Sequence, residues 1–203
     1  VNEIKKVVQG KDDIIKNVMM AILSNGHILL EDVPGVGKTT LALAFSRVLG
    51  LDYRRVQFTP DVMPSDVTGF SMYNRKTEQF EYVKGAAICN LLLADEINRT
   101  SPKTQSALLE VMEEGRVTVD GVTREVPKPF TVIATQNPFG SSGTQRLPQS
   151  QMDRFIMRLS MGYPDKESEI NILKGSGIAR VDEIVPVFSA DQLLAMQNKV
   201  SEV

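Results

Sequence analysis

The segment HILLEDVPGVGKTTLALAFS combines residue types that bind phosphate groups. The apolar run 28–30 predicts a buried strand, residues 34–37 predict a turn, and the apolar spacing in 41–45 predicts a helix. In a strand–loop–helix unit of this kind, backbone N–H groups and the helix N-terminus surround an anion. Lys38 would then reach the β and γ phosphates of a nucleotide, and the Thr39 hydroxyl would bind Mg²⁺.

The phosphate-binding interpretation extends over the whole loop. The residues expected to contact the nucleotide there are Pro34, Gly35, Val36, Gly37, Lys38, Thr39 and Thr40. The loop departs from the pattern GxxxxGK[ST] at one position, because Asp32 stands where the first glycine is usual. That position lies where the strand enters the turn rather than against the phosphates, so we expect the chemistry to persist. A glycine-rich turn of any strand–helix unit is the alternative.

Two adjacent carboxylates, Asp95 and Glu96, follow a continuous apolar run at 91–94 that predicts a central parallel strand. Adjacent carboxylates are costly to desolvate unless something binds there, and ligands gather at the carboxyl ends of parallel strands. We therefore expect both acids to face Lys38. Asp95 would hold Mg²⁺, directly or through water, and Glu96 would act as general base on an attacking water, which favours hydrolysis over transfer to a small acceptor. A solvated acidic loop is the alternative.

A second apolar run, at 130–134, ends in Thr135, Gln136 and Asn137. A polar group at that strand end would orient water or contact the γ-phosphate. Asn137 precedes a proline, and an asparagine in that position is also a common turn former.

The remaining pattern alternates predicted strands with predicted helices and indicates an α/β fold. Helices are expected at 11–25, 38–49, 102–114, 165–173 and after Ser189, which forms a capping-box pair with Gln192. Further strands are expected at 53–58 and 156–161, with hairpins at 70–84 and 116–126, the second turning at Asp120-Gly121-Val122.

The composition bounds the class of protein. The 203 residues are 42% hydrophobic and 24% charged, with a net charge of −2, which predicts a globular protein without overall attraction to nucleic acid. The single cysteine, Cys89, excludes an internal disulfide framework and a multi-cysteine zinc site, and its apolar surroundings predict a buried thiol. No apolar run is long enough to cross a bilayer and no signal pattern precedes the first helix, so we expect a cytoplasmic protein. The start at Val1 and the helix at the end predict a piece of a longer chain.

Four separated motifs resemble, in order, those of the MoxR family of AAA+ ATPases. They are EDVPGVGKT (Walker A, with an aspartate variant familiar in that family), LLLADEINR (Walker B), ATQNP (sensor 1) and LPQSQMDRF. The two hairpins are similar to the family's helix-2 insert and presensor-1 hairpin. The resemblance implies a P-loop NTPase (AAA+) fold, with a three-layer αβα core and a five-stranded parallel sheet in residues 1–162, and the start of an α-helical lid in 163–203.

The same resemblance implies roles for residues outside the phosphate loop. Val8-Gln9-Gly10 resembles the linker that lies along the adenine, Asn137 resembles sensor 1, and Arg154 resembles the arginine finger, with Arg158 as second choice. The finger would act on ATP bound by a neighbouring subunit, which implies ATP and Mg²⁺ as cofactors and a homo-oligomer, usually a hexameric ring. An ion pair with a nearby acid is the alternative for Arg154, and a surface position on an edge strand is the alternative for Arg158. Only about two lid helices fit in the chain, where the family has three or more and a sensor-2 arginine.

The resemblance predicts a Mg²⁺-dependent ATP hydrolase that remodels or activates partner protein complexes, often ones with a von Willebrand factor A domain. A nucleic-acid-remodelling AAA+ motor is one alternative, although acidic residues around the second hairpin offset its basic ones. The basic residues are Arg116, Arg124 and Lys128, and the acidic ones are Glu113, Glu114, Asp120 and Glu125. A nucleotide-gated binding module without turnover is the other, and Glu96 argues against it.

Overall fold

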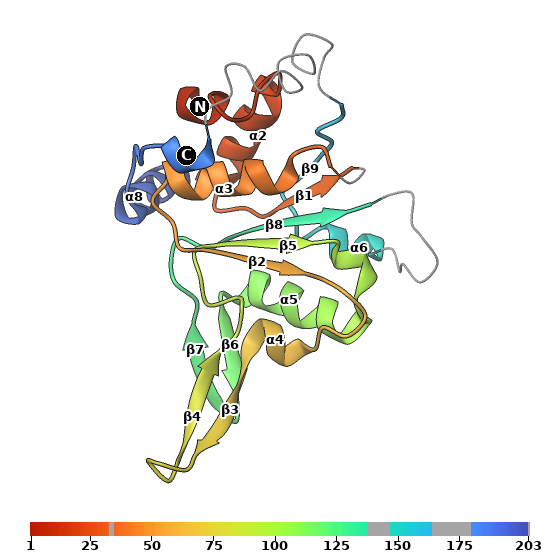
Figure 1. The fold of residues 1–203 in the computed structure, drawn as a ribbon, viewed down its shortest axis with the longest axis vertical. Helices are drawn as coiled ribbons and strands as arrows, with labels where there is room; N and C mark the ends of the chain where they lie inside the picture. The colour runs from red at the N-terminus through yellow and green to blue at the C-terminus, as the bar shows by residue number, and fades with distance from the viewer. Residues whose placement is uncertain (33–34, 138–146, 164–179, 203) are drawn as a thin grey trace.

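The computed structural model describes residues 1–32, 35–137, 147–163 and 180–202. Its centre is a five-stranded parallel sheet with the strand order β2-β5-β8-β1-β9 and helices on both faces (Figure 1). The strands are β1 (Ile28–Glu31), β2 (Tyr53–Gln57), β5 (Leu91–Asp95), β8 (Thr131–Gln136) and β9 (Met157–Leu159). The prediction of an AAA+ αβα fold with a five-stranded parallel sheet is confirmed.

The helices form two layers (Figure 1). One face of the sheet carries α1 (Asn2–Lys5), α2 (Asp12–Leu23), α3 (Lys38–Val48) and α8 (Ala190–Val200), with a short 3₁₀ turn η2 (Val181–Glu183). The other face carries α4 (Pro64–Thr68) and α5 (Pro102–Glu114). A 3₁₀ turn η1 (Ile97–Arg99) follows β5, and α6 (Gln149–Met152) precedes β9.

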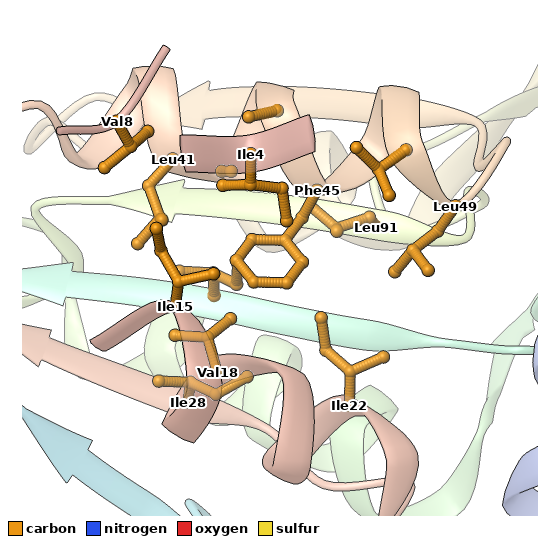
Figure 2. Packing of buried hydrophobic residues seen from close by; sticks show 14 of the residues in the cluster. Ile4, Val8, Ile15, Val18, Ile22, Ile28, Leu41, Phe45, Leu49 and Leu91 are labelled. Atoms are coloured by element: carbon orange, nitrogen blue, oxygen red, sulfur yellow. The ribbon is translucent and has the colours of Figure 1, made fainter. Parts of the chain in front are cut away.

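Strand β5 is buried along its whole length, and its side chains alternate between two hydrophobic cores. Leu91 and Leu93 belong to the core beneath α2 and α3, whereas Leu92 and Ala94 belong to the core beneath α5. This period of two is the geometry of a strand buried on both faces. Figure 2 shows the first core, where the Phe45 ring of α3 lies among aliphatic side chains of α1, α2 and β5.

Two hairpins extend away from the sheet on the α5 side (Figure 1). They are β3 (Gly69–Asn74) with β4 (Gln79–Lys84), and β6 (Arg116–Val119) with β7 (Val122–Glu125). The turn of the second hairpin has two residues, Asp120 at φ 51° and Gly121 at φ 74°. The expected three-residue turn was wrong, because two left-handed residues already close the chain and let Val122 pair with Val119.

Two other predicted boundaries also differ from the structure. The helix expected at 11–25 ends at Leu23, because Asn25 adopts a left-handed φ of 52°. The strand expected at 156–161 is limited to β9, after which residues 160–162 bond to Asp32 instead of the sheet.

The C-terminal residues that the structure describes pack on the core. The Ser189–Gln192 capping box is confirmed, Leu193 is fully buried beside α2, and Gln197 donates a hydrogen bond of 2.7 Å to the Ile22 carbonyl. The helix predicted at 165–173 lies outside the described residues, and the division into a core and a lid stays a prediction. Within the described part of the chain, no helix has the length and apolar character needed to cross a membrane.

Candidate functional site

A cavity of about 400 Å³ opens at the carboxyl ends of the central strands. Lys38 and Thr39 line it together with Asp95, Glu96 and Asn137. Its remaining lining comes from Asp32, Gly35, Gly37, Arg55, Gln57, Thr135 and Gln136. The structure thus brings four residues of the predicted loop together with the acidic pair and the asparagine, whereas Val36 and Thr40 do not line this cavity. The volume is within the usual range for small-molecule sites.

The loop before α3 presents its backbone to this cavity. Gly35 and Gly37 have φ angles of +88° and +92°, a left-handed conformation that glycine adopts without strain. Gly37 is the N-cap of α3, and no side-chain cap bonds to the first N–H groups of this helix. A Cβ added at Gly35 would meet no atom within 4 Å, so the space beside the loop is open. A helix N-terminus that follows a glycine loop beside a cavity fits a phosphate group. Pro34 lies outside the described residues.

Lys38 reaches back across the loop and donates a hydrogen bond of 3.1 Å from Nζ to the Asp32 carbonyl. Burial lowers the pKa of the Lys38 ammonium, while the carboxylates of Asp32, Asp95 and Glu96 oppose that shift. The cation therefore lies in a partly desolvated place with carboxylates nearby. A phosphate chain would supply further negative charge there.

Asp95 is 9% exposed, and each of its carboxylate oxygens has a partner from a neighbouring strand. Oδ1 accepts a hydrogen bond of 2.6 Å from the Thr135 hydroxyl of β8, and Oδ2 pairs at 2.7 Å with the Arg55 guanidinium of β2. The Thr135 oxygen also accepts the Glu96 N–H at 2.9 Å. The sequence did not predict that Arg55 bonds to Asp95. That contact requires β2 to lie beside β5, which depends on the strand order.

Glu96 combines an uncommon backbone conformation with exchangeable side-chain partners. Its φ of 56° and ψ of 48° are left-handed, which for a residue other than glycine is often found at functional sites. Its carboxylate accepts hydrogen bonds of 2.9 Å from Gln57 and 2.7 Å from Arg99. Both partners are long flexible side chains at least partly in solvent, so the Glu96 carboxylate can exchange them.

The oxygen donors of the cavity suit Mg²⁺ in combination with a nucleotide. Asp95 supplies a carboxylate and Thr39 a hydroxyl, and Mg²⁺ in phosphate sites is commonly held by one or two protein groups together with phosphate oxygens and water. Among the described residues no group of three or more His, Cys, Asp and Glu side chains forms a separate metal site. A magnesium ion here would depend on the bound phosphates.

The proposed adenine linker lies away from the phosphate cavity. Val8 is buried in the core beside α3, and Gly10 lines a neighbouring cavity of about 410 Å³ together with Ser160 and Met161. Gln9 is partly buried and lines neither cavity.

The two arginine-finger candidates are both engaged in ion pairs. Arg154 contacts Glu113 at 2.9 Å near the end of α5, and Arg158 contacts Glu31 at 2.9 Å. Ile156, two residues after Arg154, bonds to the His27 carbonyl at the amino end of β1, so Arg154 lies at the opposite end of the sheet from the cavity. Arg154 does not line the cavity of its own chain.

Cys89 is fully buried, as predicted. Burial raises the pKa of its thiol to about 12, with a smaller contribution from Asp52. Such a thiol stays protonated at neutral pH and is a poor nucleophile.

Comparisons with known proteins agree with this geometry. The family model described as "ATPase family associated with various cellular activities (AAA)" matches residues 27–157. An uncharacterized protein YeaC of Bacillus subtilis is 50% identical over 100% of this chain, and the Chaperone MoxR1 of Mycobacterium tuberculosis is 43% identical over 97%. A crystal structure of a candidate ATPase from Cytophaga hutchinsonii superimposes with a TM-score of 0.87 at 40% identity, covering 100% of this chain and 62% of that one. The chain spans 64% of the length of YeaC and 52% of that of MoxR1.

Proposed function

This chain belongs to the MoxR family of AAA+ ATPases, and we propose that it binds ATP with Mg²⁺ in the cavity beside Lys38 and hydrolyses it. The observation that carries the proposal is the convergence of Lys38, Thr39, Asp95, Glu96 and Asn137 around one cavity. A cation, a helix N-terminus, a carboxylate pair and an amide are the groups that phosphoryl transfer to water requires.

Each of these groups has a distinct part in the proposed reaction. Lys38 and the first N–H groups of α3 bind the phosphates and stabilise the charge that develops on them. Thr39 and Asp95 would hold Mg²⁺, which supplies charge neutralisation at the phosphate oxygens when it is bound. Glu96 accepts a proton from the attacking water, and Asn137 orients that water or the γ-phosphate. The Thr135 hydroxyl donates to the Asp95 carboxylate and accepts the Glu96 backbone N–H, which fixes the two residues relative to each other.

Replacing Glu96 by glutamine tests the general base. Glutamine keeps the shape and can still bond to Gln57 and Arg99, but it cannot accept the proton, so turnover should fall by about 10² to 10⁴ while ATP binding is retained. Turnover would be followed as phosphate release and binding with a fluorescent ATP analogue. Lys38→Ala is the matched control, because it should lose binding itself. Unchanged turnover in Glu96→Gln would remove Glu96 as the base.

We further propose that Arg154 acts on the ATP of a neighbouring subunit in a ring, usually of six subunits. The position of Arg154 at the far end of its own sheet supports this role, because within one chain it cannot reach the cavity. An arginine finger is worth about 10³ to 10⁵ in rate in related chemistry. A monomer should therefore hydrolyse ATP slowly.

Mixing two inactive variants tests the action in trans. Arg154→Ala subunits keep an intact cavity and Lys38→Ala subunits keep an intact arginine, so a mixed assembly should recover part of the lost turnover. Neither variant should recover when incubated alone. Mixed assembly would be verified by native mass spectrometry, and no recovery in verified mixed rings would contradict the role of Arg154.

The work done with ATP is proposed to be the remodelling or activation of partner protein complexes, including proteins with a von Willebrand factor A domain. The name of the relative MoxR1, a chaperone, and the exposed apolar side chains of the β3–β4 hairpin support a protein partner. Phe70, Met72, Tyr73 and Phe80 are 44% to 75% exposed there. Stimulation of turnover by DNA at low salt, without stimulation by protein, would favour a nucleic-acid motor instead.

A further inference from the structure

The departure from the phosphate-loop pattern at Asp32 has a structural counterpart. Asp32 is 7% exposed, and its carboxylate accepts three hydrogen bonds from the segment that follows β9. Oδ1 accepts the Ser160 hydroxyl at 3.1 Å and the Gly162 N–H at 3.2 Å, and Oδ2 accepts the Met161 N–H. A glycine, usual at this position, could form none of these contacts. We call residues 160–163 the connecting segment.

The connecting segment is also held from its opposite side. The Lys11 ammonium donates to the carbonyls of Met161 at 2.5 Å, Gly162 at 3.2 Å and Tyr163 at 2.7 Å. Gly162 adopts a φ of +60°, in the left-handed region, within this turn. The N–H groups of the segment therefore bond to the Asp32 carboxylate, and its carbonyl groups bond to the Lys11 ammonium. Each side chain thus complements the partial charge of the backbone groups that it contacts.

These contacts lie between the two cavities near the phosphate loop. Asp32 lines the cavity of Lys38, whereas Lys11, Ser160 and Met161 line the cavity beside Gly10. The Met161 side chain also packs on the loop, with its Cε 3.9 Å from the position of a Cβ at Gly37. Moreover, the Asp32 carbonyl accepts the Lys38 ammonium at 3.1 Å. Asp32 thus bonds to the phosphate-binding lysine through its backbone and to the connecting segment through its side chain.

We propose that Asp32 is a positioning residue that couples occupation of the phosphate cavity by a nucleoside triphosphate to the connecting segment and, through Lys11, to the cavity beside Gly10. Phosphates that bind Lys38 draw its ammonium away from the Asp32 carbonyl. The loop then adjusts at Asp32, and the carboxylate transmits the change to Met161 and Gly162. This inference rests on the proposed nucleotide binding.

Hydrogen–deuterium exchange on Asp32→Gly, with a fluorescent ATP analogue and Mg²⁺ as the probe, tests the coupling. The variant removes the carboxylate and keeps the backbone carbonyl that accepts Lys38, so its exchange at Met161 and Gly162 without nucleotide should rise roughly 10- to 100-fold, as expected for lost hydrogen bonds to a charged group. The nucleotide is then added at a concentration that saturates the variant, as verified by the fluorescence signal. In the unsubstituted protein, the nucleotide should change exchange in the connecting segment. In Asp32→Gly that response should be lost. Asp120→Asn, which removes an exposed carboxylate that lies in the β6–β7 turn and lines neither cavity, is the control and should behave like the unsubstituted protein.

A second variant keeps the test valid if Asp32→Gly does not fold. Lys11→Met leaves the phosphate loop untouched, and it should retain nucleotide binding while losing the response at Tyr163. A nucleotide response in folded Asp32→Gly equal to that of the unsubstituted protein would overturn the coupling, as would a bound nucleotide that changes nothing in the segment. An unsubstituted protein that binds no nucleotide would overturn the proposed function and this inference together, and the binding signal distinguishes that result from the other two.

Discussion

The two ends of the central sheet both contain buried polar side chains, but these side chains have different partners. At the carboxyl end of β5, the two adjacent carboxylates bond to side chains around a cavity, Asp95 to Arg55 and Thr135 and Glu96 to Gln57. At the amino end, side chains bond mainly to backbone. There, Asn90 accepts the Asp52 N–H at 3.2 Å and donates to the Pro129 carbonyl at 2.9 Å.

His27 shows the amino-end pattern most clearly. Its Nδ1 accepts the Val132 N–H at 3.0 Å, and its Nε2 lies 3.0 Å from the Met112 carbonyl. Because Nδ1 accepts, the neutral ring carries its proton on Nε2 and donates it to Met112. Burial lowers the pKa of His27, which agrees with a neutral ring. The imidazole joins β1, β8 and the end of α5, although it also lines a cavity of about 330 Å³.

The comparison shows that polarity and a cavity do not by themselves mark a catalytic site. His27 and Asn90 each bond to the backbone of two separate segments, so neither can change partners without separating parts of the fold. Side chains that bond to other mobile side chains can exchange them for a ligand at low cost. The two ends would also meet in a closed ring, if Arg154 at the amino end of one subunit serves the cavity of the next.

The largest expected loss of stability comes from Thr135, and a second threonine on the same strand, Thr131, serves as its control. Thr135→Val removes the hydroxyl that joins Asp95 to the Glu96 N–H, so it should lower the free energy of unfolding by about 1–3 kcal/mol and reduce turnover. Thr131→Val, at the amino end of β8, replaces an equally buried hydroxyl that has no hydrogen-bond partner among the described residues, and should be neutral or stabilising. Urea unfolding and phosphate release measure both. Equal losses in the two variants would refute the contrast between the two ends.

A smaller effect is expected from the pH dependence of stability. The native pKa of His27 is below its ordinary value of about 6.5, so the unfolded chain binds a proton that the folded chain does not. The contribution of His27 to the free energy of unfolding is therefore fully present above about pH 6.5. It is lost as the pH falls toward the lowered native pKa, by at most about 1.4 kcal/mol per pH unit.

Urea unfolding between pH 7.5 and 5.5 measures that slope. His27 is the only histidine of the chain, so His27→Gln should flatten the profile in this window. A slope that is the same in both proteins would assign the pH dependence to carboxylates instead.

The smallest effect is expected from the ion pair that holds Arg154. Glu113 is 59% exposed, so Glu113→Gln should change the free energy of unfolding by less than about 1 kcal/mol. Turnover of the assembled protein should be retained or should increase, because Arg154 is released for the neighbouring cavity. Arg154→Ala is the matched variant that should lose turnover. A loss of turnover in Glu113→Gln as large as that in Arg154→Ala would show that the pair, and not a free finger, is required.

The elements of the site could be predicted because their signals are local. The run at 91–95 predicts a buried strand with an acid at its end, and the glycines before Lys38 predict a loop that precedes a helix. Boundaries were less accurate wherever a residue such as Asn25 took a left-handed conformation, since local pattern does not specify φ. The hydrogen bonds of Asp32 could not be predicted, because its partners lie more than a hundred residues away along the sequence.

Residue order alone predicted the α/β class, the strand–loop–helix unit around residues 28–48, the acid at the end of β5 and the apolar periods, because these depend on neighbours a few positions apart. Folding in three dimensions decided which strands flank β5, and hence that Arg55 and Thr135 bond to Asp95. It also placed Arg154 at the far end of the sheet and joined Asp32 to residues 160–162. Such contacts arise from strand order and chain reversal, which bring distant segments together through burial of the whole core rather than through any local sequence preference.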